Sequence, residues 1–266
     1  MNISLPTENK RFQIRVGVRA FEPMTLGVTC SDISRQNSDY IRRKVPFKEQ
    51  SFLGQRSVYR EFTLPFPVSP DKMNVKFYDK LNGGNDNFSL EKFKIEKMPN
   101  AEVWAEPDIH RFIDFNLDFS QRAGYLSTGI YDSNDGDFLI QYLPTITNEF
   151  GSPLVTPART NRRTGRIQVS QSAFKTYTVP VRIVVLFHER FHFQIPTRRE
   201  KPADLNALRV YLDLGFPRTE GVYASTQIFL NHPDTVGKSH LDRVEDNVAF
   251  IDKYSYRKEA WKNATV

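Results

Sequence analysis

The sequence predicts an α+β fold, in which an antiparallel β sandwich or barrel precedes a second domain that ends in helices. Three observations lead to this prediction. Apolar and polar residues alternate with a period of two through the first 97 residues, as in half-buried strands. The pattern changes after Met98–Glu102, and from about residue 178 apolar residues recur at helical spacing. We therefore expect a β-rich domain over residues 1–98 and a second domain over residues 99–266.

The composition excludes several classes of protein. Of the 266 residues, 39% are hydrophobic and 13% aromatic, which is too many for a disordered, collagen-like or coiled-coil chain. The single cysteine, Cys30, excludes an internal disulfide framework and a zinc site built from cysteines. Any metal must therefore be held by histidines and carboxylates.

Location and partners follow from apolar runs and charge. The longest apolar run, Ile183–Phe187, is far too short to span a membrane, and Met1–Arg15 is too polar for a secretion signal. We expect a cytoplasmic protein with no membrane partner. The net charge of +6 permits an acidic partner, but the basic clusters are not interleaved with aromatic residues on a defined face. Nucleic acid is therefore not an expected partner.

In the first domain, four segments alternate most clearly. They are Phe12–Val18, Ser57–Leu64, Asn74–Tyr78 and Phe88–Ile95. The turn-forming residues of Leu81–Asn87 predict a hairpin between the last two strands. The prolines at 65, 67 and 70 are expected to break the sheet between strands. Short strands separated by turns are typical of a small sandwich or barrel.

The first part of the second domain mixes patterns. Ile109–Phe119 fits either a strand or a helix, whereas Phe138–Leu143 predicts a strand. Asp132–Asp137 before it resembles a calcium-binding loop, but its glycine comes one position early and no bidentate Glu follows. We expect a plain hairpin turn there. After a loop over residues 148–165, Arg166–Ser170 predicts a short edge strand.

Four helices are expected in the last third of the chain. They cover Thr178–Phe193, a segment from Pro202 to Gly215, a segment from Pro217 through Phe229, and a segment capped by Ser239 and Asp242. Thr178 is placed to cap the first of them, with Pro180 in the first turn. An alternative remains for Val181–Phe187, because its β-branched residues also suit a buried strand.

The motif His188-Glu189-Arg190-Phe191-His192 has the pattern H-E-x-x-H. On a helix, residues four apart lie on one face, so both imidazoles could bind a single Zn²⁺. The glutamate would lie about 100° round the helix, close enough to remove a proton from water at the metal. The alternative is a pair of histidines in the protein core, which a strand would separate.

A catalytic zinc has three protein ligands, and the sequence offers two downstream carboxylates for the third. Glu200 and Asp204 are four apart, in the first turns of the helix that Pro202 opens. A short connection predicts that this helix packs antiparallel to the helix of His188 and His192. Glu200 would then be the third ligand and Asp204 would orient an imidazole, although the two carboxylates could exchange these roles.

The segment Glu200-Lys201-Pro202-Ala203-Asp204-Leu205-Asn206-Ala207 resembles the E-x-x-A-D-x-x-A segment that follows H-E-x-x-H in gluzincin metallopeptidases. The HtpX and CAAX-prenyl-protease kind are the nearest examples, and ImmA/IrrE-like proteins carry a related segment. The resemblance covers about residues 110–230 and implies a zincin-like domain in which Glu200 is the third zinc ligand. The sequence departs from those families in a shorter gap after His192, in the absence of transmembrane helices, and in Pro202, which replaces an acidic residue.

The whole chain also resembles, more weakly, uncharacterised proteins of tailed phages that infect Bacteroidetes, the crAss-like group among them. This resemblance rests on the β-rich first half joined to residues 188–192 and 203–212. It implies a structural protein of the virion, such as a ring, neck or tail component, with protein subunits as partners.

Two functions are therefore expected from the sequence. The first is a zinc-dependent metalloendopeptidase, or a protein derived from one, with Zn²⁺ on His188, His192 and Glu200 and with Glu189 activating water against a peptide bond. The second is a non-enzymatic virion component that retains the zincin fold.

Overall fold

The computed structural model describes residues 1–81, 84–103, 105–195, 199–231 and 237–263, with the backbone alone for residues 227–231 and 255–263. Its contacts divide the chain into two compact units. The first comprises Met1–Ala101 with Gly215–Pro217, and the second comprises Glu102–Leu214 with Arg218–Val266. The division thus falls after Ala101, where the sequence suggested residue 98.

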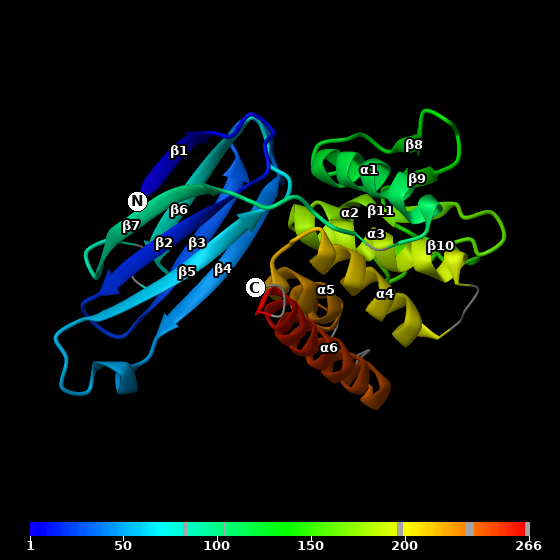
Figure 1. Ribbon diagram of the computed structural model, residues 1–266. Coiled ribbons are helices and arrows are strands. Elements are labelled where there is room, and N and C mark those ends of the chain that lie inside the picture. The colour runs from blue at the N-terminus through cyan, green and yellow to red at the C-terminus, as the bar shows by residue number, and fades with distance from the viewer. Residues whose placement is uncertain (82–83, 104, 196–198, 232–236, 264–266) are drawn as a thin grey trace. The chain divides into compact units, whose positions relative to one another are not determined.

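The first unit is a β sandwich of two antiparallel sheets (Figure 1). Its elements are β1 (Asn2–Pro6), β2 (Phe12–Ala20), β3 (Met24–Asp32), β4 (Asp39–Phe47), the 3-10 helix η1 (Glu49–Phe52), β5 (Val58–Phe66), β6 (Lys72–Asp79) and β7 (Phe88–Lys97). One sheet has the order β1-β6-β3-β4 and the other β5-β2-β7. Phe77 and Phe93 meet edge to face across the sheets, with ring centroids 6.3 Å apart. Neither sheet closes on itself among the described strands, so the unit is a sandwich rather than a barrel.

Two predictions for this unit are wrong. β6 and β7 belong to different sheets, so Leu81–Asn87, of which residues 82 and 83 lie outside the described part, leads from one sheet to the other and is not a hairpin turn. Pro65 lies inside β5, opposite Gln13 of β2, and does not break the sheet. β5 is an edge strand, where a missing N–H group costs no ladder hydrogen bond on its open side.

The second unit combines a small mixed sheet with helices (Figure 1). Its elements are α1 (Pro107–Arg122), β8 (Gly129–Asp132), β9 (Leu139–Leu143), β10 (Ala158–Thr160), β11 (Ile167–Ser170), α2 (Gln171–Phe174), α3 (Val179–Gln194), α4 (Glu200–Asp213), α5 (Arg218–Asn231) and α6 (Lys238–Asn263). The sheet has the order β10-β11-β9-β8, in which β11 and β9 run parallel. The ambiguous segment Ile109–Phe119 is therefore helical, and the strand after the Asp132–Asp137 turn pairs antiparallel with β8.

The prediction that Arg166–Ser170 forms an edge strand is wrong, because β10 pairs with its outer side. The backbone N–H of Asn161 donates to the carbonyl of Arg166 at 2.8 Å, and Gly165 has a φ of 70°. This tight turn folds the expected loop back into a hairpin, since glycine adopts a positive φ without strain. The two edge strands of this sheet are therefore β10, next to β11, and β8.

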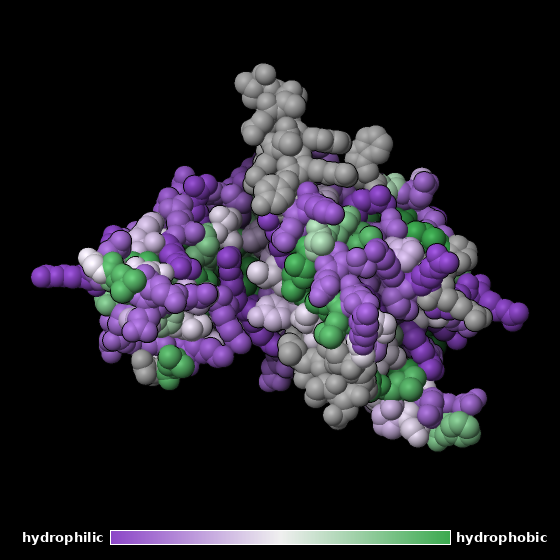
Figure 2. Space-filling view, turned by 90° about the horizontal axis from the view of Figure 1, so that it is seen from below, coloured by the Kyte–Doolittle hydropathy of each residue, from purple (hydrophilic) through white to green (hydrophobic). Residues whose placement is uncertain are grey.

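Large hydrophobic residues reach the surface singly. Among them are Phe150, Leu53 and Ile130, at 83%, 78% and 66% exposed. On the face drawn in Figure 2, hydrophilic residues predominate and hydrophobic ones form small separate groups. Scattered exposed hydrophobic side chains of this kind are normal on protein surfaces. No helix in the described residues is long and apolar enough to cross a membrane.

Candidate metal centre

Helix α3 carries the H-E-x-x-H motif and is the most enclosed helix of the second unit. Every residue from Val179 to Phe187 is buried, and α3 packs against α1, α4, α5, β10 and β11. This burial explains the β-branched sequence that also suited a strand, because a helix enclosed on all sides is apolar all round. The strand alternative for Val181–Phe187 is therefore wrong.

The helix begins where the sequence indicated, but Thr178 does not cap it through its side chain. Its hydroxyl instead donates to Oε2 of Glu220 on α5 at 2.5 Å, and both residues are buried. At the other end, the guanidinium of Arg190 contacts the carboxylate of Asp108 on α1. These two contacts fix α3 against α5 before its first turn and against α1 between the two histidines.

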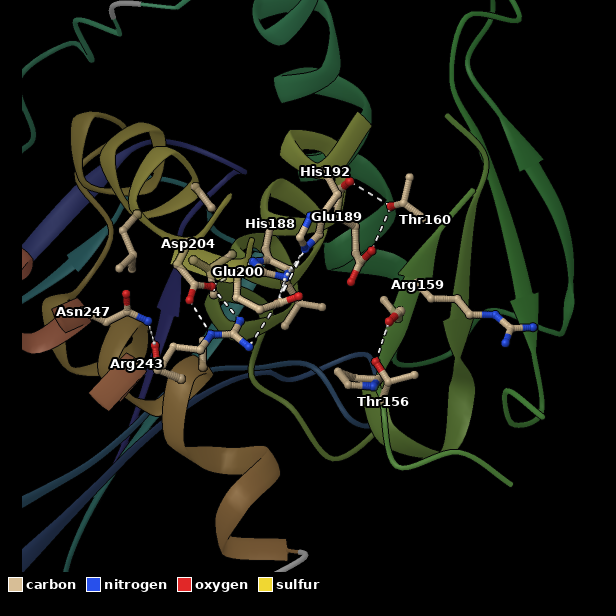
Figure 3. A pocket seen from close by; sticks show the side chains of 18 of the residues that line it. Thr156, Arg159, Thr160, His188, Glu189, His192, Glu200, Asp204, Arg243 and Asn247 are labelled. Atoms are coloured by element: carbon tan, nitrogen blue, oxygen red, sulfur yellow. Dashed lines mark hydrogen bonds and ion pairs between the residues drawn. The ribbon is translucent and has the colours of Figure 1, made fainter. Parts of the chain in front are cut away.

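The two histidines and Glu200 bring three potential ligand atoms together. The Nε2 atoms of His188 and His192 are 3.0 Å apart. Oε2 of Glu200, at the start of α4, lies 3.3 Å from the first nitrogen and 3.5 Å from the second. The three atoms thus form a nearly equilateral triangle, to which an antiparallel pair of helices contributes all three corners (Figure 3).

This triangle matches the size of a tetrahedral zinc site. With bonds of about 2.05 Å, two ligand atoms of a tetrahedral zinc lie about 3.3 Å apart. The measured separations of 3.0, 3.3 and 3.5 Å fall around that value. Two imidazole nitrogens and a carboxylate oxygen also form one of the ligand sets that catalytic zinc uses. The residues present therefore fit the metal that the sequence resemblance implies.

Asp204 lies on the other side of His188, one helical turn after Glu200. Its Oδ1 is 2.8 Å from Nδ1 of His188, although the two groups lack the alignment of a hydrogen bond. Because Nδ1 faces Asp204, Nε2 is left to face Glu200 and His192. A carboxylate in this position orients a metal-binding imidazole from behind.

Arg243 of α6 joins the two carboxylates. Its Nη1 lies 3.1 Å from Oε2 of Glu200, its Nη2 donates to Oδ1 of Asp204 at 2.7 Å, and its Nε also contacts Asp204. A guanidinium is a planar group with several donors, so it can hold two carboxylates at once. Arg243 thereby fixes the carboxylates of α4 relative to α6.

Glu189 points to the opposite side of the histidines, toward the edge strand (Figure 3). The hydroxyl of Thr160, in β10, contacts both the backbone carbonyl and Oε2 of Glu189, each at 2.8 Å. Glu189 is only 8% exposed, and it lines the same cavity as the two histidines. Strand β10 therefore holds this carboxylate in one orientation at the cavity wall.

Opposite charges dominate the electrostatics of the cluster. Burial opposes a charge on His188, but its contacts with Asp204 and Glu200 outweigh burial and raise the pKa of His188 to about 9. Contacts with His188 and His192 hold the pKa of Glu200 well below its usual range. Burial raises the pKa of Asp204, yet His188 and Arg243 outweigh it and lower that pKa. Without a metal, two ionised carboxylates thus face a protonated His188 at neutral pH, and a metal ion would have to displace that proton.

The cluster lines a cavity of about 270 Å³ in the second unit. Thr156, Arg159 and Thr160 lie on one side of it and Arg243 and Asn247 on the other (Figure 3). The remaining lining residues are Pro157, Ala158, Arg162, Val184, Val185, Ala207, Leu208, Ala224 and Ser225. The cavity thus combines the donor cluster with an apolar wall.

Sequence reasoning identified the donors but missed Thr160, Arg243 and Asn247. A signal existed for the last two, because residues four apart on a helix share a face. Val244, Val248 and Ile251 recur at helical spacing and mark the buried face of their helix. Asn247, three residues after Val244, lies on the same face and is therefore a polar side chain turned toward the interior. The short strand that carries Thr160 left no comparable signal.

Tyr211, Tyr223 and His232 follow the motif in the sequence and could be expected to stabilise an oxyanion. Neither tyrosine lines the cavity, and Tyr211 is fully buried. His232 lies outside the described residues.

Comparison of the chain with protein-family models and with curated proteins finds no match. The geometry of the site therefore carries the functional argument.

Proposed function

We propose that the chain is a zinc-dependent peptidase whose metal is held by His188, His192 and Glu200. The observation that carries this proposal is the triangle of donor atoms, with sides of 3.0, 3.3 and 3.5 Å. Bound zinc supplies a Lewis acid that lowers the pKa of water and polarises a carbonyl oxygen. The remaining chemistry belongs to the side chains around it.

Glu189 is the proton acceptor in this proposal. It follows His188 directly, so it lies on the neighbouring part of the helix surface and reaches the same cavity. Thr160 engages Oε2 of Glu189, which leaves Oε1 as the other oxygen of a carboxylate that lines the cavity. Oε1 is thus the atom that takes the proton from water, and it can pass that proton to the departing amine.

The edge strand supports a peptide as the substrate. β10 pairs with β11 on one side only, and its residues Ala158 to Thr160 line the cavity. An extended peptide can add to such an edge through backbone hydrogen bonds, which place its carbonyl groups in a regular row. Asp204 and Arg243 keep the third ligand and the first imidazole in position during this chemistry.

Metal analysis and a single variant test the proposal. The purified chain should hold about one zinc ion, which a His188→Ala/His192→Ala variant should lose. Glu189→Gln should retain the zinc and lose peptide hydrolysis, because an amide does not accept the proton. Glu149→Gln, the same change at an exposed position, is the matched control and should keep both. A native chain without zinc, or full hydrolysis by Glu189→Gln, would refute the proposal.

A structural role in a phage particle is the second candidate. It follows from the weaker sequence resemblance, and the engagement of Glu189 by Thr160 and of Glu200 by Arg243 is compatible with a site that is retained without activity. Under this proposal the partners are other virion subunits and the cluster is a retained scaffold. Light scattering and electron microscopy of the purified chain test it. Ordered assembly without hydrolysis favours the virion role, and a monomer that hydrolyses peptides contradicts it.

A further inference from the structure

Some residues that line the cavity lie one helical turn from the donor cluster along α3 and α4, and we call them the inner layer. Val184 and Val185 precede His188 on α3 by four and three residues, and Ala207 and Leu208 follow Asp204 on α4 by three and four. Residues three or four apart on a helix lie one above the other, about 5 Å along its axis. The helices that carry the donors therefore also build this inner layer.

α5 and α6 complete the inner layer with polar groups. Asn247 follows Arg243 on α6 by four residues, so it also stands one turn from the donor cluster. It lies beside Arg243, on the side of the cavity away from Thr160 (Figure 3). Its Nδ2 donates to Oγ of Ser225 on α5 at 2.9 Å. One half of the amide is thus anchored to the neighbouring helix.

The other half of this amide has no hydrogen-bond partner among the described residues. Oδ1 of Asn247 is buried and unpaired, and the residue as a whole is 2% exposed. A buried acceptor without a donor is costly, because it has lost its hydrogen bonds to water. The surrounding walls are aliphatic: Val184, Val185 and Leu208 are 5%, 8% and 2% exposed. Among the described residues, the inner layer therefore combines aliphatic walls with one unpaired side-chain acceptor, Oδ1 of Asn247.

We infer that this inner layer receives a substrate side chain that ends in a primary amide, and that glutamine fits best. An aliphatic stem suits the walls, and the amide N–H donates to Oδ1 of Asn247. An extended glutamine side chain reaches roughly 5 Å from its Cα, which matches one helical turn. A primary amide both donates and accepts hydrogen bonds. The glutamine side chain therefore also complements Asn247 if the Oδ1 and Nδ2 positions of Asn247 are exchanged.

Charged side chains are excluded from the inner layer by its neighbours. A carboxylate would bring a second acceptor against Oδ1 of Asn247. A lysine or arginine would bring a second cation beside the guanidinium of Arg243, in a pocket whose low polarity strengthens that repulsion. A methionine has the length of glutamine and no donor, so it would leave Oδ1 unsatisfied. Methionine is thus the sharpest comparison.

The inference rests on the proposed function, and peptide binding tests it separately from hydrolysis. Zinc-loaded Glu189→Gln protein is titrated calorimetrically with short alanine peptides that carry Gln, Met or Glu at one central position. We expect the Gln peptide to bind roughly tenfold to hundredfold more tightly than the Met peptide. Equal affinities for the Gln and Met peptides would overturn the inference.

Leucine is similar in size to asparagine and is apolar. The Asn247→Leu variant should therefore bind the Met peptide more tightly than the Gln peptide. Ser225→Ala is the milder second variant. It removes the anchor of the Asn247 amide and should reduce the Gln preference without filling the pocket. A Gln preference that survives in both variants would overturn the inference, even if Asn247→Leu is poorly folded.

Hydrolysis by the native chain distinguishes a failure of the glutamine preference from a failure of the proposed peptidase function. If the chain holds zinc and cleaves a peptide library with no glutamine preference beside the cut bond, only the inference fails. If it holds no zinc or cleaves nothing, the proposed function fails, and titration of the native chain with the same three peptides still decides the amide preference.

Discussion

Replacing Asp204 by Asn separates a group that orients a ligand from a ligand itself. Oδ1 of Asp204 lies 2.8 Å from Nδ1 of His188, on the far side of that ring from Glu200 and His192. Loss of such an outer carboxylate typically weakens metal binding by about 10- to 100-fold, or about 1.4 to 2.7 kcal/mol. Asp204→Asn should therefore still bind one zinc ion, with an affinity lowered by that factor.

Glu200→Gln should have a larger effect. Oε2 of Glu200 forms a corner of the donor triangle, so in the proposed site its replacement removes a ligand rather than a support. Zinc affinity should fall by more than the roughly hundredfold expected for Asp204→Asn. Competition titration with a chromophoric chelator measures both affinities. Asp213→Asn is the control matched to Asp204→Asn. Asp213 also lies on α4, but its carboxylate contacts Tyr254 and not the donor cluster.

The order of these two effects tests the assignment of roles. If Asp204→Asn loses zinc more completely than Glu200→Gln, the two carboxylates have exchanged roles. If neither change weakens zinc binding relative to Asp213→Asn, the triangle is not the metal site and the reasoning from its dimensions is wrong.

Three further predictions concern pH and stability. With zinc removed by a chelator, the pKa of His188 stands at about 9, above its usual 6.5, so its contacts stabilise the fold fully below pH 6.5. That contribution should be lost as the pH rises through about 9, which thermal melts across this range would follow. Thr178→Val removes a hydrogen bond to the buried carboxylate of Glu220 and should lower the free energy of unfolding by about 1.5 to 3 kcal/mol in urea titrations. Gly27→Ala should cost about 1 to 3 kcal/mol, measured in the same way, because the added Cβ would lie 2.4 Å from a ring atom of Tyr78.

Each of these predictions has a control. A His188→Gln variant should lose the fall in stability between pH 6.5 and 9, and a fall of unchanged size would assign it to another group. Thr178→Ser keeps the hydroxyl and should stay closer to the native stability than Thr178→Val. Tyr78→Ala should relieve the crowding at position 27, so the double variant should lose less than the two single losses added together.

The sequence predicted those parts of the fold in which local pattern and tertiary environment agree. The helix of His188 and His192 was located from a cap position and a proline, both of which act locally. β3 was missed because Leu26, Gly27 and Val28 are all buried, which removes the alternation of a half-exposed strand. Gly27 is buried because the ring of Tyr78 on β6 covers it, and no pattern within β3 contains that information.

The candidate site shows the same division. His188, His192, Glu200 and Asp204 were found together because two helices of known spacing and a short connection restrict where side chains can meet. Arg243 comes from a helix almost forty residues further along the chain, and its approach depends on how α6 packs against α4. The edge strand was misplaced for a related reason, since β10, with three residues, is too short for periodicity to reveal.

The complete burial of the first half of α3 also has a kinetic consequence. Amide protons in this helix exchange with solvent only when the surrounding helices and strands open together, so they should be among the slowest in the second unit. Because α3 is buried by its neighbours, we expect the scaffold to fold without a metal and to hold the imidazoles of His188 and His192 near the separation that the proposed zinc requires. Metal binding then costs little ordering entropy, and its removal by a chelator should leave the slow exchange of α3 intact. In this respect the proposed centre would differ from a zinc finger, which unfolds when its ion is removed.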